Sequence, residues 1–161
     1  MQENPTTTRN RLGLSAPTIV LLAGVAGIRV PLHDLGVLDE GTVAAFLLAV
    51  VPLGIWVAVA LWRRVPNPVL TLTVVGLAYG VVLATVHQLM WDVAFDGDGP
   101  RLGGNLAGVL DPAAESLLLR TASVPSSLLT GAALGLLAGA VAWAIRRVTA
   151  GPRGIDRRSG V

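Results

Sequence analysis

The sequence predicts an all-α integral membrane protein, a bundle of four membrane-spanning helices. Of its 161 residues, 53% are hydrophobic and only 14% are charged, and the mean hydropathy is +0.68. These values are typical of a chain embedded in a lipid bilayer. Four apolar stretches are each long enough to cross the bilayer as a helix. The third of them, 69–91, is apolar on every face and does not alternate as a half-exposed strand would.

The distribution of arginine predicts how the bundle is oriented. The chain contains no lysine. Nine of its 12 arginines lie in three places: the tail 1–11, the loop between the second and third spans, and the chain from 146 onward. Only two acids share these places, whereas the remaining segments hold three arginines and eight acids. The positive-inside rule therefore predicts a multi-pass protein of the plasma (inner) membrane with both tails in the cytoplasm. Because the arginines flank apolar stretches without interleaved aromatic residues, nucleic acid is not expected as a partner.

The first span is predicted at 12–30. Ser15 is the expected N-cap and Pro17 falls in the first turn, whereas Arg29 and Pro31 are expected to end the helix. At 1.5 Å per residue this helix is about 28 Å long, which is enough to cross the bilayer. A cleaved signal peptide is the alternative, since a basic start, an apolar core and small residues are also its features. The length of the apolar run favours a retained span.

The second and third spans, 42–62 and 69–91, are predicted to form an antiparallel hairpin, because only six residues connect them. Pro52 falls inside the second span and is expected to kink it by removing one backbone hydrogen bond. All four spans are assigned to a single membrane domain, 12–147.

The fourth span is predicted at 124–145, after an outer segment, 92–123, that is long for a bundle connection. Asp111 as an N-cap and Pro112 at the first helical position predict a short helix near 112–121 within this segment. We expect this helix to be separate from the span and to lie on the membrane surface or on the bundle.

Glycines at a spacing of four residues mark two of the spans. Gly131, Gly135 and Gly139 share one face of the fourth span, and Gly76 and Gly80 share one face of the third. Small residues at this spacing let two helix backbones approach closely in a bilayer. The pattern predicts helix packing within the chain, with dimerisation through the Gly131 stripe as the alternative.

A polar cluster is predicted at the outer membrane boundary. Arg29 and His87 each lie eighteen residues beyond a cytoplasmic span boundary, so both reach a depth of about 27 Å. Gln88 is expected to face the bundle, with Asp92 one turn further out, and Arg29 is expected to pair with Asp92 or Asp34 because an unpaired charge is costly there. A structural interpretation is that Arg29 and His87 only reach the headgroups. The functional interpretation is an outward-facing ligand site in which His87 titrates or accepts a hydrogen bond.

Few residues are candidates for catalysis or metal binding. The absence of cysteine excludes disulfides, thiolate metal sites and thiol nucleophiles. His33 and His87, with aspartates nearby, have the residue types of a metal site but not the spacing, so neither a metal nor a cofactor is predicted. The sequence contains no nucleophile motif, Walker lysine or dinucleotide fingerprint, and therefore does not predict an enzyme.

Aromatic residues are predicted to have structural roles. Trp62, Trp91 and Trp143 fall where interfacial tryptophans are expected, with Trp56 deeper. Tyr79 lies near the middle of the third span, where core packing is favoured over a substrate contact.

Together these features predict a small membrane protein with a non-catalytic role, as an accessory or interaction subunit. The arginine-only basic residues and the abundance of Ala, Val, Leu and Gly favour a high-GC bacterial source. A small dimeric transporter or channel with an outward-facing site around His87, Gln88 and Arg29 is the alternative. The expected partners are the lipid bilayer and either a second copy of the chain or another membrane protein.

Overall fold

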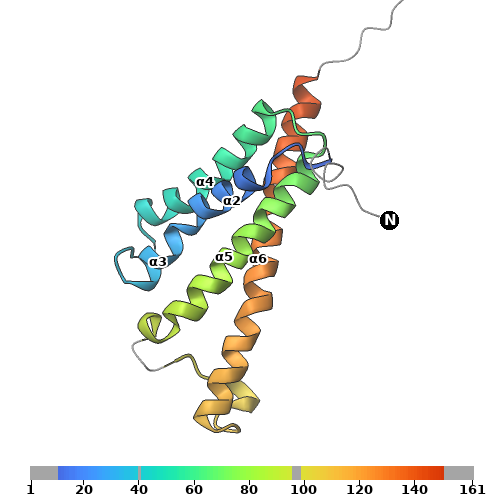
Figure 1. Cartoon of the computed structure of the whole chain (residues 1–161). Coiled ribbons are helices and arrows are strands. Elements are labelled where there is room, and N and C mark those ends of the chain that lie inside the picture. The colour runs from blue at the N-terminus through green and yellow to red at the C-terminus, as the bar shows by residue number, and fades with distance from the viewer. Residues whose placement is uncertain (1–10, 40, 96–98, 151–161) are drawn as a thin grey trace, which may run out of the picture.

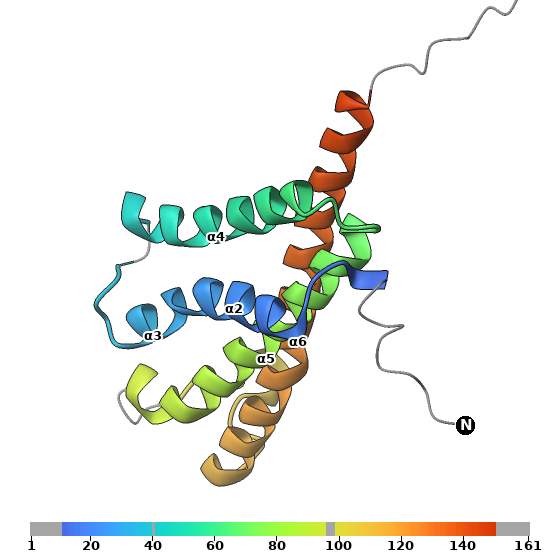
Figure 2. The same cartoon turned by 45° about the horizontal axis from the view of Figure 1, so that its top comes forward.

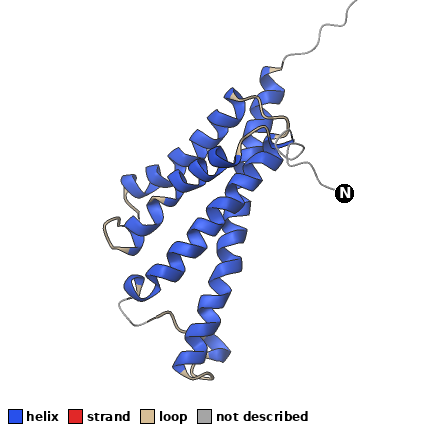
Figure 3. Cartoon of the chain, in the orientation of Figure 1, coloured by secondary structure: helices blue, strands red, loops and turns tan. Residues whose placement is uncertain are grey.

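The computed structural model describes residues 11–39, 41–95 and 99–150, and every regular element in these ranges is helical (Figure 3). The prediction of an all-helical chain with four membrane-length apolar helices is confirmed. The predicted tails, 1–11 and 148–161, fall almost entirely outside the described residues. Along the chain (Figure 1) the elements are α2 (Ala16–Gly27), α3 (Arg29–Asp34), α4 (Val43–Trp62), α5 (Pro68–Ala94), the 3₁₀ turn η1 (Gly104–Leu106) and α6 (Pro112–Thr149).

The helices fan out from one end of the bundle, where α4 joins α5 and the last turns of α6 lie (Figure 2). We call this the Val65 end, and the opposite end the His87 end. At the Val65 end, the Arg146 guanidinium donates a hydrogen bond to the Val65 carbonyl, with Nη1 2.6 Å from the oxygen. The Thr71 hydroxyl donates to the Leu12 carbonyl over 2.7 Å. The first contact holds the α4–α5 loop against α6, and the second holds the N-terminal segment against α5.

The first membrane-length segment differs from the predicted span, 12–30, at both ends. It runs from Ala16 to Asp34 as α2 and α3. Gly13 separates Leu12 from α2 because its φ of +68° is in the left-handed region. The prediction that Arg29 and Pro31 end the helix is wrong. Pro31 has no backbone N–H to bond a carbonyl of the preceding turn, so the helix is interrupted between α2 and α3. The backbone at the junction nevertheless stays right-handed helical, and α3 continues to Asp34.

The helices α4 and α5 begin within one residue of the spans predicted for them, and each is capped by a side chain. The Thr42 hydroxyl accepts a hydrogen bond from the backbone N–H of Ala45, and the Asn67 side chain accepts one from the N–H of Leu70. Capping satisfies donors that the first helical turn leaves unpaired. The connection between the two helices is short, so α4 and α5 form an antiparallel hairpin.

The separate short helix predicted near 112–121 and the fourth span predicted at 124–145 form one continuous helix, α6. Its start at Asp111 and Pro112 agrees with the capping pattern, since the Asp111 carboxylate accepts hydrogen bonds from two backbone N–H groups. Pro125 lies inside α6 without ending it. Nearby, the Ser123 and Ser127 hydroxyls donate to carbonyls of the preceding turn. Such hydroxyl donors help a membrane helix to tolerate proline.

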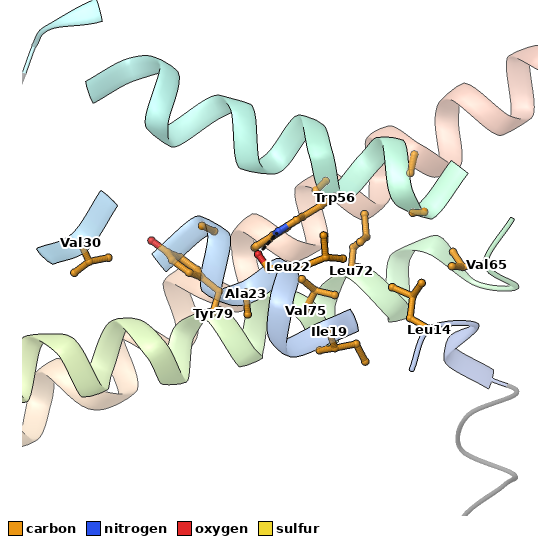
Figure 4. Close-up of a cluster of buried hydrophobic side chains, with 14 residues drawn as sticks. Leu14, Ile19, Leu22, Ala23, Val30, Trp56, Val65, Leu72, Val75 and Tyr79 are labelled. Atoms are coloured by element: carbon orange, nitrogen blue, oxygen red, sulfur yellow. Dashed lines mark hydrogen bonds between the residues drawn. The ribbon is translucent and has the colours of Figure 1, made fainter. Parts of the chain in front are cut away.

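A hydrophobic core fills the space between α2, α4 and α5 (Figure 4). Trp56 is fully buried, and its indole N–H donates to the Leu22 carbonyl over 2.9 Å. The Tyr79 ring meets the Trp56 ring edge to face, with centroids 6.1 Å apart. Leu72 and Val75 of α5 complete this layer with no exposed surface. Ala138 and Ala142 of α6 belong to the same cluster, so the core joins α2, α4, α5 and α6 through the middle of the bundle.

The glycine stripes lie in the contact between α5 and α6. A Cβ atom added to Gly76 would overlap the carbonyl oxygen of Gly131, and one added to Gly131 would overlap that of Gly76. Gly135, Gly80 and Gly139 likewise face backbone atoms of the opposite helix. The helices therefore pack backbone against backbone along these stripes, as small residues permit. The face of α6 that a dimer through the Gly131 stripe would need is occupied by α5 of the same chain.

Candidate functional site

A groove opens between α3, α5 and α6 just beyond the last glycine contact. Gly80 faces the backbone of Ser127 and Leu128; toward the His87 end the residues at the interface become larger and polar, and α5 and α6 diverge (Figure 1). The groove has a volume of about 420 Å³. We call it the His87 groove. It is lined by His33, Asp34, Leu83, His87, Trp91, Ala94, Phe95, Ser123, Ser126, Ser127 and Thr130.

The end of α3 supplies the charged wall of the groove. The Asp34 side chain is only 6% exposed, whereas that of His33 is 40% exposed. Asp34 Oδ1 lies 3.4 Å from His33 Nδ1, at the long end of hydrogen-bond distance. Asp34 Oδ2 is buried and has no hydrogen-bond partner among the described residues. A carboxylate oxygen in this state is costly unless something compensates for its lost hydration.

Hydroxyl groups from one face of α6 form the second wall. Ser123, Ser126, Ser127 and Thr130 follow the i, i+3, i+4, i+7 spacing that places residues on one helix face. Ser126 and Thr130 are exposed. The Ser127 hydroxyl is buried and donates to the Ser123 carbonyl over 2.8 Å. This face offers a ligand several hydroxyl oxygens that accept as well as donate hydrogen bonds.

The end of α5 supplies His87 and an aromatic wall. His87 is half-buried in the groove. Trp91 and Phe95, each one turn beyond the last, pack edge to face with centroids 5.2 Å apart. Trp91 is buried at 6% exposure and its ring also stacks against the Arg120 guanidinium, 5.2 Å from the ring centroid. Arg120 of α6 thus packs against the Trp91 side of this aromatic wall.

Gln88, which the sequence grouped with His87, lies outside the groove. It faces α6, where its side-chain amide donates to the Arg120 carbonyl over 2.8 Å and to the Ser123 hydroxyl over 2.9 Å. Successive residues of a helix point about 100° apart, and here His87 lines the groove whereas Gln88 is turned toward α6. The structure gives Gln88 a packing contact.

Arg29 and Asp92, the other two predicted site residues, are not brought together. Asp92 Oδ1 pairs with Arg120 Nη2 at 2.6 Å, and its side chain is 82% exposed. The expected ion pair between Arg29 and either Asp92 or Asp34 is therefore wrong within the described residues, where the buried Nε of Arg29 has no hydrogen-bond partner. Equal depth in the bilayer fixes height along the helices but leaves the direction of each side chain open. Neither Arg29 nor Asp92 lines the His87 groove.

The sequence interpretation missed the hydroxyl face of α6 and the contribution of α3. The spacing of serine and threonine on α6 could have predicted this polar face, because it places four hydroxyl residues on one side of an apolar helix. His33 and Asp34 were noticed only as metal-ligand types. Their position in the groove follows from the continuation of α3 beyond Pro31, which the proline rule did not predict.

A second hollow, of about 260 Å³, lies beside the groove where the connection from α5 reaches α6. The Glu115 carboxylate is buried there and accepts a hydrogen bond from the Leu102 backbone N–H. Trp91 and Phe95 separate this hollow from the His87 groove, since both residues line both spaces. The Glu115 contact fixes the segment after residue 99 against the first turn of α6.

Replacing Gln88 with leucine should cost stability and leave the groove intact. The two hydrogen bonds to α6 would be lost, and interhelical hydrogen bonds in membrane proteins contribute about 0.6 kcal/mol each on average. We expect a loss of roughly 1 kcal/mol in the free energy of unfolding, measured by circular dichroism in detergent. The matched change Leu89→Ala, at a position 79% exposed, should have a smaller effect. Equal effects would contradict a packing role for Gln88.

Comparison with protein-family models, with curated protein sequences and with solved structures finds nothing that matches this chain. The groove must therefore be interpreted from its own residues, which supply one buried carboxylate, two imidazoles, several hydroxyls and an aromatic wall.

Proposed function

We propose that this chain is a multi-pass plasma-membrane protein with both termini in the cytoplasm. The Val65 end carries Arg63, Arg64, Arg146 and Arg147, and the His87 end carries most of the acids. The positive-inside rule then puts the Val65 end in the cytoplasm and opens the His87 groove to the outside. Stacking of Arg147 on Trp143, with 5.0 Å from the guanidinium to the ring centroid, supports an interfacial position for the Val65 end.

Within that orientation, we infer a non-catalytic binding role, as an accessory or interaction subunit that holds a small ligand in the His87 groove. One observation carries this inference: the polar groove ends where the glycine packing between α5 and α6 begins. Beyond that point the two backbones are in contact, and the space between α2, α4 and α5 is filled by apolar side chains. A binding site open at one end favours recognition over passage.

A transporter or channel remains the competing function, and it makes a different physical demand. Translocation needs a polar path or an alternative packing that opens the Val65 end. The contacts at that end, including Arg146 with Val65 and Thr71 with Leu12, would have to break. Reconstituted protein should therefore fail to dissipate a potassium or proton gradient across liposomes. Gradient loss that depends on the protein would replace the binding role by transport.

Single-cysteine labelling tests the groove directly, because the chain has no cysteine of its own. Thr130 lines the groove, whereas its neighbour Leu129 is 71% exposed on another face at the same height. In intact cells a membrane-impermeant maleimide should label Thr130→Cys much faster than Leu129→Cys, because the reactive thiolate needs water.

Two further variants are the positive and negative controls for this assay. Ala107→Cys, in the exposed segment before α6, should react readily from outside, and Thr149→Cys, near the Val65 end, only after the cells are permeabilised. Labelling of Thr149→Cys in intact cells would overturn the orientation. Equal rates at Thr130→Cys and Leu129→Cys would overturn a water-filled groove and the binding role built on it.

A further inference from the structure

We propose that the His87 groove binds an organic ammonium ion, with the charged nitrogen near Asp34 and the apolar body against the aromatic wall. This inference rests on the proposed binding role of the groove and adds the chemical class of the ligand. The ammonium group belongs either to a free amine or to a lipid headgroup, and both sources present the same chemistry to the groove.

The buried carboxylate of Asp34 selects for positive charge. Its side chain is 6% exposed, its Oδ1 has only the 3.4 Å contact with His33 Nδ1, and its Oδ2 has no partner among the described residues, so the carboxylate has lost hydration and gained little hydrogen bonding in return. Charges interact more strongly in a medium of low polarity than in water. A cation in the groove would offset this cost, whereas an anion would increase it. Arg29, on the same helix, does not supply this cation: it forms no ion pair with Asp34 and does not line the groove.

The remaining walls match the rest of such a ligand. An ammonium group has N–H donors that the hydroxyl oxygens of Ser126 and Thr130 can accept. The faces of Trp91 and Phe95 attract cations and also pack against apolar groups. A volume of about 420 Å³ lies within the usual range for small-molecule sites.

A divalent metal ion is the main competitor, since two imidazoles and a carboxylate are ligand types for zinc. A zinc ion would use His33, His87 and Asp34 and leave the aromatic wall and the hydroxyl face without a role. An organic ammonium uses every wall of the groove, and for this reason it is the ligand that we propose.

The test uses the full chain in nanodiscs of phosphatidylglycerol, with 2-phenylethylamine as the probe and empty nanodiscs as the blank. Calorimetry at neutral pH should show binding of the protonated amine. The neutral analogue 2-phenylethanol should bind at least about tenfold more weakly, because hydrogen bonds to charged groups contribute roughly 1.5–3 kcal/mol. Asp34→Asn should weaken amine binding by about the same factor. Asp39→Asn, the same change at an exposed site in the connection from α3 to α4, should have no effect.

Each outcome decides between named alternatives. Equal binding of amine and alcohol, or unchanged binding by Asp34→Asn, would overturn the ammonium assignment. Binding of zinc that requires both His87 and Asp34, without amine binding, would replace it by a metal site. Competition by phosphatidylethanolamine added to the nanodiscs would support the ammonium chemistry and assign it to a headgroup. The proposed binding role is tested separately, by labelling of Thr130→Cys in the absence of any ligand. The ammonium proposal can therefore fail without overturning that role.

Discussion

Replacing Gly76 with alanine is expected to destabilise the protein by about 1–3 kcal/mol or more. The added methyl group would overlap the Gly131 carbonyl oxygen and lie 2.8 Å from the Gly135 Cα atom, and both are backbone atoms. A side chain could rotate away, but a backbone atom can move only if α5 and α6 separate. The loss of dispersion contacts would then extend along the whole glycine stripe. Unfolding followed by circular dichroism in detergent measures the effect.

Gly54→Ala is the matched control, because an added methyl group there would meet nothing within 4 Å. Alanine favours an exposed helix interior over glycine by roughly 0.5–1 kcal/mol, so this variant should be as stable as the parent chain or slightly more so. If Gly76→Ala behaved like Gly54→Ala, the backbone contact between α5 and α6 would be refuted. Gly135→Leu extends the test to dimerisation: a stripe used within the chain predicts unfolding of the variant, whereas a stripe used between chains predicts a folded monomer by mass measurement.

The helices could be predicted from the sequence because their cause is local. Continuous apolar runs of sufficient length, bounded by arginines and caps such as Thr42 and Asn67, define membrane helices without reference to the rest of the fold. The errors occurred at prolines, where tertiary contacts decide. Pro31 was expected to end the first span, but α3 continues beyond it. A separate span was expected to begin at 124, but α6 runs through that position and through Pro125.

The candidate site was predicted in part, for a geometric reason. Counting residues along a helix gives the height of each side chain, and His87, which this count singled out, is among the residues that line the groove. Height does not give direction, so Gln88, Arg29 and Asp92 were grouped with His87 although the structure turns them elsewhere. The partner of Asp92 is Arg120, a residue on α6 that no pattern in the sequence connected with it.

Trp56 is a core residue whose depth, but not whose neighbours, could be predicted from the sequence. Its removal is the second large effect that we expect. It is fully buried, donates its N–H to the Leu22 carbonyl and packs edge to face on Tyr79. Because α4 is apolar on every face, the sequence placed Trp56 deep in the bilayer without identifying its neighbours.

Trp56→Ala would leave a cavity at the junction of α2, α4 and α5. Removal of a buried tryptophan from a water-soluble core costs about 3–5 kcal/mol, part of which is the transfer of the side chain from water. In the bilayer location that we propose, that part is absent because separated helices leave their side chains in lipid, so we expect a loss of roughly 2–3 kcal/mol.

Trp56→Phe separates packing from hydrogen bonding. It keeps most of the ring but removes the donor to the Leu22 carbonyl, so it should cost only about 0.6 kcal/mol, the average for an interhelical hydrogen bond. Trp62→Ala is the control for tryptophan removal, since Trp62 is 78% exposed, and it should leave the unfolding transition nearly unchanged. A Trp56→Ala variant as stable as Trp62→Ala would mean that α4 does not pack on α2 and α5. A large effect of Trp56→Ala with a small effect of Trp56→Phe would assign the stability to ring packing.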